Sequence, residues 1–362
     1  MKIGIDGRIC DEGGYYGEYV CRLIEDFCAL RSEDEIIIFR NKGTLTSKKI
    51  GAMRHAQQKN ISLSRVSLLH ESKTRKLFEQ EKFSLMIFFD HHIPKGYSGD
   101  FYVLIESLKE IFFPKKKWLH RKIYTHKLSR ALSKSTKVMT LDSGTALELN
   151  ERLNIKEDLI ERIPGFFPTF ETRDTLQIQI DIKTKHNIRG EYLIYDSWNE
   201  VHNNFERILR TLKKLKDQGN ILSLLILCDE TTKDIDIRST ALDLWITDQI
   251  YFLWAVKRDL EYSYYAGSVW VIFSSIYESF PFQFTKALSY NIPIFANDIP
   301  ANKEVMWEDI HYLDPLSIHN MSDVISWVLA QRQLQTWYDR ISDTYNCLVS
   351  AKRLSEIIEI KK

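Results

Sequence analysis

The sequence predicts an α/β protein with two domains, each built on a parallel β-sheet. The chain has 362 residues, which is more than one ordinary hydrophobic core supports and suits two domains of typical size. Short apolar runs of the kind that buried parallel strands require alternate with helical patterns in both halves. Pro164-Gly165 interrupts this alternation near the middle of the chain, so we expect the domain boundary there.

The first half opens with a strand and a turn rich in glycine. Residues 3–5 predict the strand, and Gly13, Gly14 and Gly17 lead into a helix whose apolar residues share one face. Glycine in such a turn lets the backbone approach a ligand beside a helix amino terminus, although a purely structural turn is the alternative. Further strands are expected at residues 35–39, 85–89, 101–105 and 137–141.

The second half repeats the alternation of strands and helices. Residues 168–182 are interpreted as an irregular connector, and a helix is expected at about 182–187. Strands are expected at residues 192–195, 222–227, 251–253, 269–273 and 294–296, and a helical tail from Met321 onward. The predicted domains are 1–167 and 168–340, with residues 341–362 as a carboxyl-terminal helix.

Composition and charge are those of an ordinary globular protein. Hydrophobic residues make up 44% and charged residues 27% of the chain, and the net charge of +1 gives no field that favours nucleic acid. The five cysteines include no C-x-x-C pair, which argues against a zinc site or a disulfide framework. No apolar run is long enough to span a membrane. The first strand begins without a leader pattern, so we expect a cytoplasmic protein.

Residues 267–305 are the most informative segment. Residues 269–273 predict a buried strand, a polar loop containing Glu278 follows, and residues 282–288 begin a helix. Pro293 then opens another strand. Ligands bind at the carboxyl ends of strands in open α/β sheets, so Glu278 is a candidate site residue.

The same segment resembles the donor-binding segment of the group 1 retaining GT-B glycosyltransferases, whose pattern is S-x-x-E-G-F-G-x-x-x-x-E-A-x-x-x-G-x-P-V-x-A. The residues that match in register are Ser275, Glu278, Phe280, Ala287, Pro293 and Ala296. The resemblance implies a GT-B architecture: two Rossmann-like parallel-sheet domains that face each other across a cleft, with a carboxyl-terminal helix that returns to the first domain. It also implies a nucleotide-sugar donor, a glycan acceptor, and transfer with retention and without a metal or cofactor.

The resemblance also assigns roles to individual residues. Glu278 takes the catalytic position near the donor sugar. The positions assigned to donor binding are Gly13, Gly14, Gly17, Ser197, His202, Asn203, Ser279, Phe280 and Lys286.

Four losses at the implied donor site stand out against the family pattern. Trp198 and Asn203 stand where the family has an arginine and a lysine that offset the charge of the leaving diphosphate. Lys286 replaces a glutamate that accepts hydrogen bonds from the ribose, whereas an ammonium group only donates. Pro281 replaces a glycine and has no N–H. A shift of one residue in the alignment offers His202 as the cation instead.

The first domain departs from the family pattern as well. Glu106-Ser107 stand where the family commonly has a histidine after the strand at 101–105. His91-His92 follow the preceding strand and either reach the site from that loop or are surface histidines.

Residues 112–137 form a basic segment with nine lysines and arginines and no acidic residue. Trp118, Ile123 and Tyr124 are among the apolar residues interleaved at roughly helical spacing. The segment either lies on an anionic membrane at the inner face, or packs on the sheet as an amphipathic helix with a solvated basic face. Confinement of the charge to one segment argues against nucleic-acid binding.

Three hypotheses for function follow. The first is a glycosyltransferase that moves a sugar from a nucleotide-sugar to an envelope or exopolysaccharide acceptor, which is lipid-linked if the basic segment contacts a membrane. The second is a catalytically degenerate GT-B protein that acts as partner or scaffold of an active glycosyltransferase. The third is a sugar-binding module with Trp198 and Trp254 as stacking platforms.

Overall fold

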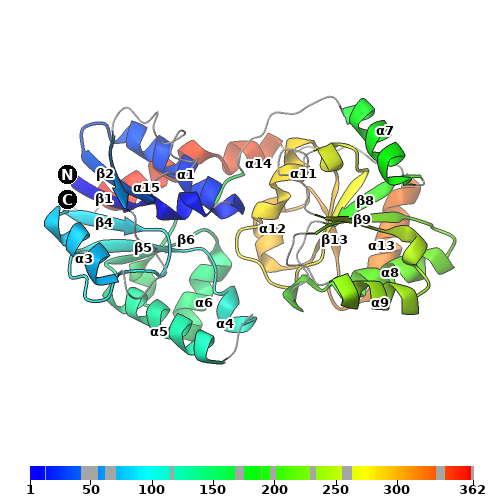
Figure 1. Cartoon of the computed structure of the whole chain (residues 1–362), viewed down its shortest axis with the longest axis horizontal. Helices are drawn as coiled ribbons and strands as arrows, with labels where there is room; N and C mark the ends of the chain where they lie inside the picture. Colours follow the sequence, from blue (N-terminus) through cyan, green and yellow to red (C-terminus); the bar gives the residue numbers. More distant parts are fainter. Residues whose placement is uncertain are drawn as a thin grey trace. The chain divides into compact units, whose positions relative to one another are not determined.

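The computed structural model describes residues 1–12, 14–41, 56–61, 71–114, 118–167, 175–188, 190–195, 201–228, 234–254, 263–331 and 339–359. The chain forms two compact units, drawn in Figure 1. Unit 1 comprises Met1–Pro168 together with Ser342–Lys362, and unit 2 comprises Thr169–Ile341.

Unit 1 contains a seven-stranded sheet in the order β3-β2-β1-β4-β5-β6-β7. All of its strand pairs are parallel. The strands are β1 (Lys2–Asp6), β2 (Glu35–Asn41), β3 (Ala56–Ile61), β4 (Leu85–Phe88), β5 (Phe101–Ile105), β6 (Lys137–Thr140) and β7 (Ile160–Arg162). Every residue of β4 and β5 is buried, as the continuous apolar runs of a sheet covered on both faces require.

The helices of unit 1 connect these strands and cover the sheet. In chain order they are η1 (Gly7–Asp11), α1 (Gly14–Leu30), α3 (Glu71–Gln80), α4 (Lys109–Phe112), α5 (Trp118–Lys134), α6 (Ser143–Leu153), η3 (Glu157–Leu159), α14 (Asp339–Thr344) and α15 (Cys347–Glu359), of which α14 begins in unit 2.

Helix α15 returns to unit 1 and packs beside α1 (Figure 1). The Ser350 hydroxyl donates to the Pro164 carbonyl at 2.6 Å, and Arg31 forms an ion pair with Glu359 at 3.1 Å. Leu354, Ile357 and Ile358 on the same helix are buried. The last helix of the chain therefore completes the core of the first unit.

Unit 2 contains a six-stranded parallel sheet in the order β10-β9-β8-β11-β12-β13. Its strands are β8 (Tyr192–Tyr195), β9 (Ser223–Cys228), β10 (Ile250–Trp254), β11 (Trp270–Phe273), β12 (Ile294–Asn297) and β13 (His311–Leu313). Its helices are α7 (Thr175–His186), η4 (Val201–Asn203), α8 (Phe205–Asp217), α9 (Asp234–Asp243), η5 (Thr247–Gln249), η6 (Phe282–Phe284), α11 (Thr285–Ser289), α12 (Pro300–Met306) and α13 (Ile318–Gln331). Helix α8 buries its apolar face against α9, α13 and the sheet.

The predicted fold class and the return of the last helix are confirmed, and each strand that the sequence predicts is present. The interpretation of residues 168–182 as an irregular connector is wrong, because α7 already begins at Thr175. Its apolar residues Ile178, Ile180 and Ile182 alternate with polar ones, so they form no helical face in the sequence. Strand β3 was not predicted, because the sequence AQQKNI carries little apolar signal at the edge of the sheet.

Asp142 fixes the start of α6, at the carboxyl end of β6. Its carboxylate accepts hydrogen bonds from the Thr145 backbone N–H and the Thr145 hydroxyl, both at 2.8 Å, and the residue is buried. Loss of an amino-terminal cap of this kind costs about 1–2 kcal/mol. We therefore expect Asp142→Ala to lower the free energy of unfolding by about that amount in urea denaturation. Asp158→Ala, at an exposed aspartate of the same unit, should change it little; equal losses in the two variants would contradict the capping role.

Candidate functional site

The strand order of unit 2 places a candidate site between β8 and β11. The chain proceeds from β8 to β9 and β10 on one side, and then from β11 to β12 and β13 on the other. Loops that leave the carboxyl ends of two such strands diverge and open a crevice where ligands bind. The loop after β8 contains His202 and Asn203, and the loop after β11 contains Ser275 and Glu278. The structure thus brings together predicted residues that are more than seventy positions apart in the chain.

Hydrogen bonds join the two loops around Asn203. The Asn203 carbonyl accepts from the Ser274 hydroxyl at 2.5 Å and from the Tyr195 hydroxyl at 3.1 Å. Its side-chain oxygen accepts from the Ser275 hydroxyl at 3.2 Å, and the residue is 5% exposed. The buried Asn203 therefore links the loop after β8 to the loop after β11, through its backbone carbonyl and its side chain.

Asn297, the last residue of β12, forms hydrogen bonds to the loop after β11. Its side-chain nitrogen donates to the carbonyls of Ser274 at 2.5 Å and Ser275 at 3.2 Å. Asn302 donates in turn to the Asn297 carbonyl at 2.9 Å. The side-chain oxygens of both asparagines are buried and accept no hydrogen bond within the described residues, so we expect ordered water to bond to them. Buried asparagine side chains therefore hold the loop that carries Glu278 in place.

The remaining predicted residues of unit 2 line the same loops or lie behind them. Glu278 is partly exposed, whereas Ser279 and His202 are buried. Phe280 is buried and packs on the Phe282 ring at 4.8 Å between centroids. The His202 carbonyl accepts from the Ile276 backbone N–H at 2.7 Å. Ser197 and Trp198 lie outside the described residues.

Lys286 is a buried cation close to these loops. It lies on α11 and is 4% exposed, and its ammonium nitrogen is 5.1 Å from the centroid of the Tyr265 ring. The face of an aromatic ring attracts a cation, and this attraction offsets part of the cost of burying the charge. Lys286 is the lysine among the predicted site residues of unit 2.

In unit 1 the strand order reverses between β1 and β4. Gly14 has φ +73° and open space around the position of a Cβ, so the turn requires glycine on conformational grounds. A Cβ at Gly17 would lie 3.0 Å from the Ile9 carbonyl oxygen. Gly17 therefore lets α1 pack closely on η1, which is a structural role. Gly13 lies outside the described residues.

Charged and polar side chains gather in the loops after β1 and β4. Arg8 is buried and binds both carboxylate oxygens of Asp6, through Nε at 2.7 Å and Nη2 at 2.6 Å. After β4, the Asp90 carboxylate lies 2.7 Å from Nδ1 of His92. The sequence indicated the two histidines but not the carboxylate that pairs with His92, because this pairing depends on the backbone conformation of the loop.

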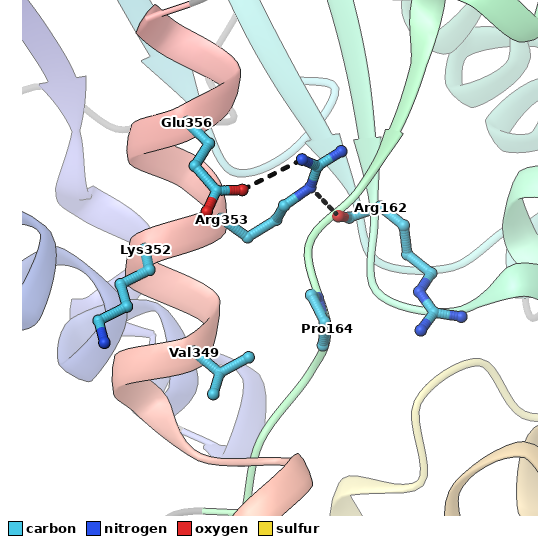
Figure 2. A pocket seen from close by; sticks show the side chains of 6 residues that line it. All are labelled: Arg162, Pro164, Val349, Lys352, Arg353 and Glu356. Carbon is cyan, nitrogen blue, oxygen red and sulfur yellow. Dashed lines mark hydrogen bonds and ion pairs between the residues drawn. The ribbon is translucent and has the colours of Figure 1, made fainter.

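A pocket of about 450 Å³ lies elsewhere in unit 1, between α15 and the segment after β7 (Figure 2). Its lining residues are Arg162, Pro164, Val349, Lys352, Arg353 and Glu356. The Arg353 guanidinium already pairs with Glu161 at 3.0 Å and with Glu356 at 3.2 Å. Figure 2 shows the side chains of Arg162 and Lys352 pointing away from each other. The positive groups do not converge, so this pocket is a weak candidate for an anion site.

No group of three or more potential ligands among histidine, cysteine, aspartate and glutamate occurs within the described ranges. Over the same ranges, no helix is both long and apolar enough to cross a membrane.

Residues 179–341 match the family described as glycosyl transferases group 1. A comparison with curated proteins gave no match.

Solved structures of low sequence identity share the whole fold. Sucrose-phosphate synthase from Thermosynechococcus elongatus is 13% identical with a TM-score of 0.73, and the alignment covers 99% of this chain and 98% of that one. Anabaena Alr3699/HepE, solved in complex with UDP-glucose, is 10% identical with a TM-score of 0.73 and 99% coverage of both chains. WaaG, a glycosyltransferase involved in lipopolysaccharide biosynthesis, is 12% identical with a TM-score of 0.68, and the alignment covers 98% of this chain and 99% of that one.

The match begins within α7 and ends at the last residue of unit 2, so it includes both loops of the candidate site. The resemblance that the segment at 267–305 indicates is thereby confirmed: the chain has the GT-B fold, and its second unit matches the group 1 glycosyl transferases.

Proposed function

We propose that the protein transfers a sugar from a nucleotide-sugar donor to a glycan acceptor of the cell envelope or of an exopolysaccharide. One observation carries the proposal: the group 1 segment folds where the strand order of unit 2 reverses, with Glu278 in the loop that leaves β11. UDP-glucose is the ligand named for the HepE structure, and we take it as the first donor to test. We expect transfer with retention and without a metal.

In this proposal the residues of unit 2 have distinct roles. Glu278 accepts hydrogen bonds from hydroxyl groups of the donor sugar. Lys286 supplies positive charge to the diphosphate, in place of the cations that the sequence lacks at Trp198 and Asn203. Asn203 and Asn297 keep both loops in position, because their amides are committed to bonds within the protein. Preorganised charge of this kind stabilises the leaving group as the bond to the sugar breaks.

We further propose that the first part of the basic segment at 112–137 contacts an anionic membrane surface. Trp118 is 67% exposed and Ile123 is 43% exposed, and the Lys122 ammonium lies 4.5 Å from the centroid of the Trp118 ring. Leu128 and Leu132 on the same helix are buried in the core of unit 1. The buried part of α5 packs on the sheet, and the exposure of its first turns supports the proposed membrane contact, which suits a lipid-linked acceptor.

A second candidate function is that of a partner or scaffold for an active glycosyltransferase. The observation that favours it is the burial of Asn203, whose side-chain oxygen bonds to Ser275. An amide committed in this way brings no cation to a diphosphate. Binding of the donor decides between the two candidates.

Donor binding is best measured by isothermal titration calorimetry with UDP-glucose, and with GDP-mannose in parallel. We expect the wild-type protein to bind one of them with micromolar affinity. Lys286→Met should weaken binding by about ten- to a hundredfold, because a hydrogen bond to a charged group contributes about 1.5–3 kcal/mol. Methionine keeps the apolar stem, so the fold should survive, and thermal denaturation checks this.

Lys303→Met is the matched control for this measurement. Lys303 lies on α12 with its ammonium 5.8 Å from the centroid of the Tyr312 ring, but it is exposed and pairs with Asp298. Its loss should leave the affinity within twofold. The scaffold function is favoured instead if the wild type binds neither nucleotide-sugar and Lys286→Glu gains binding.

Membrane contact is tested by cosedimentation with vesicles. We expect the protein to bind vesicles that contain phosphatidylglycerol and not vesicles of phosphatidylcholine alone. Lys122→Ala should weaken the partition about fivefold, because one basic residue near an anionic surface contributes about 1 kcal/mol. Lys134→Ala, at the opposite end of α5, is the control and should have a smaller effect. Equal losses in the two variants, or equal binding to neutral vesicles, would contradict this contact.

A further inference from the structure

Each sheet has two edge strands, whose outer backbone groups offer a template for pairing with another chain. They are β3 and β7 in unit 1, and β10 and β13 in unit 2. Proteins protect such edges with very short strands or with charged side chains. Strands β7 and β13 have three residues each, β7 contains Glu161 and Arg162, and the sequence of β3 includes Lys59. These three edges are therefore protected in the usual ways.

Strand β10 lacks these protections. Its five residues, with the sequence IYFLW, include no charged residue and no proline. It pairs with β9 residue by residue from Ile250 to Trp254, so no bulge turns the edge away. Among the strands that the structure describes, β9 is its one partner. The outer side of β10 is therefore an apolar edge on which a further strand can pair.

Exposed apolar side chains lie beside this strand. Trp254 is 40% exposed, and its ring lies nearly parallel to that of Phe252, with 6.3 Å between the centroids. The Arg238 guanidinium of α9 lies 4.3 Å from the centroid of the Phe252 ring, which places that face of α9 beside β10. Leu242 lies one turn further along the same face of α9 and is 65% exposed. The strand and its flank together form an apolar surface on unit 2.

Trp245, which lies in the chain between α9 and β10, is a second unusual feature of this region. Its φ of +57° is in the left-handed region, which glycine and asparagine prefer and bulky residues rarely adopt. The residue is nevertheless 80% exposed, so packing within the chain offsets little of the conformational cost. An exposed tryptophan held in this way indicates a contact outside the chain, where tryptophan is enriched.

We propose that two copies of the chain pair through β10, antiparallel about a two-fold axis at Phe252. The sheets of the two second units then become one continuous sheet. Phe252 lies opposite Phe252 of the second copy, Tyr251 lies opposite Leu253, and Ile250 lies opposite Trp254. Cross-strand pairs of aromatic and apolar side chains stabilise a sheet, and this register supplies them along the whole strand.

A second copy is the occupant that the composition of the strand favours. Like charges directly opposite each other destabilise a strand pair, and β10 has no charge to repel an identical strand. Most soluble oligomers are symmetric, and dimers that use the same surface on both subunits are the commonest. An anionic membrane or a nucleic acid finds no basic residue on the strand. Strands β9 and β8 separate β10 from β11, so this edge is distinct from the candidate site, and the inference is independent of the proposed function.

Sedimentation velocity of the full-length protein measures the association. We expect a dimer at micromolar concentrations. Trp254→Lys should weaken the dimer about a hundredfold or more, because it removes an interface tryptophan and adds a charge to the edge of both copies. Trp327→Lys is the matched control, since Trp327 is 57% exposed on α13, which packs on α8 and β13. It should leave the dimer dissociation constant within twofold, and thermal denaturation checks that both variants fold. A monomeric wild type, or equal losses in the two variants, overturns the proposal.

Cysteine cross-linking tests the register of the two strands. Residues directly opposite in an antiparallel pair have Cα atoms about 4.5–5.5 Å apart, which a disulfide spans. We therefore expect Phe252→Cys to give a covalent dimer when diamide oxidises the two thiols. Tyr251→Cys is the control, because the two copies of this residue are diagonal neighbours, about 7–8 Å apart and beyond the reach of a disulfide. A dimeric Phe252→Cys protein that does not cross-link, or cross-linking through Tyr251→Cys instead, overturns the proposed pairing.

Discussion

Parallel strand pairing is the constraint on which the candidate sites depend. Both sheets are parallel throughout, so helices return the chain after each strand and cover the faces. Polar side chains that could bind a ligand are then confined to the loops at the ends of the strands. In each sheet the strand order reverses once, between β1 and β4 in unit 1 and between β8 and β11 in unit 2. Glu278 and His92 both lie in loops at these points, although nothing in the sequence relates the two residues.

Buried hydrogen bonds determine which polar groups remain able to bind a ligand. The side-chain amides of Asn203 and Asn297 form hydrogen bonds to the loop after β11. The Tyr16 hydroxyl donates to the loop after β4. A buried polar group without a partner is costly, so such bonds are kept. The side chains of Glu278 and His92 are partly exposed. Gly17 is a packing residue, because a side chain there would press against the Ile9 carbonyl oxygen.

Local patterns predicted most of the fold and part of the site. Apolar runs located the buried strands, because a strand covered on both faces must be apolar along its length. The spacing from Ser275 to Ala296 located the loop that carries Glu278 and the family that the second unit matches. Helix α7 and strand β3 were missed, since the alternating isoleucines of the first form no helical face and the second lies at a sheet edge with few apolar residues. Propensity and periodicity do not register elements that tertiary packing imposes.

The sequence by itself determined two parallel α/β domains, the order of their elements and the identity of the residues at the strand ends. Only the tertiary structure decided which contacts those residues make. It committed Asn203 to the interior of a loop, placed Lys286 over Tyr265, and paired His92 with Asp90. The physical reason is that strand propensity and apolar spacing act over a few neighbouring residues. The direction of a side chain and its hydrogen-bond partner depend instead on loops brought together from distant parts of the chain, and on the exact backbone conformation of each loop.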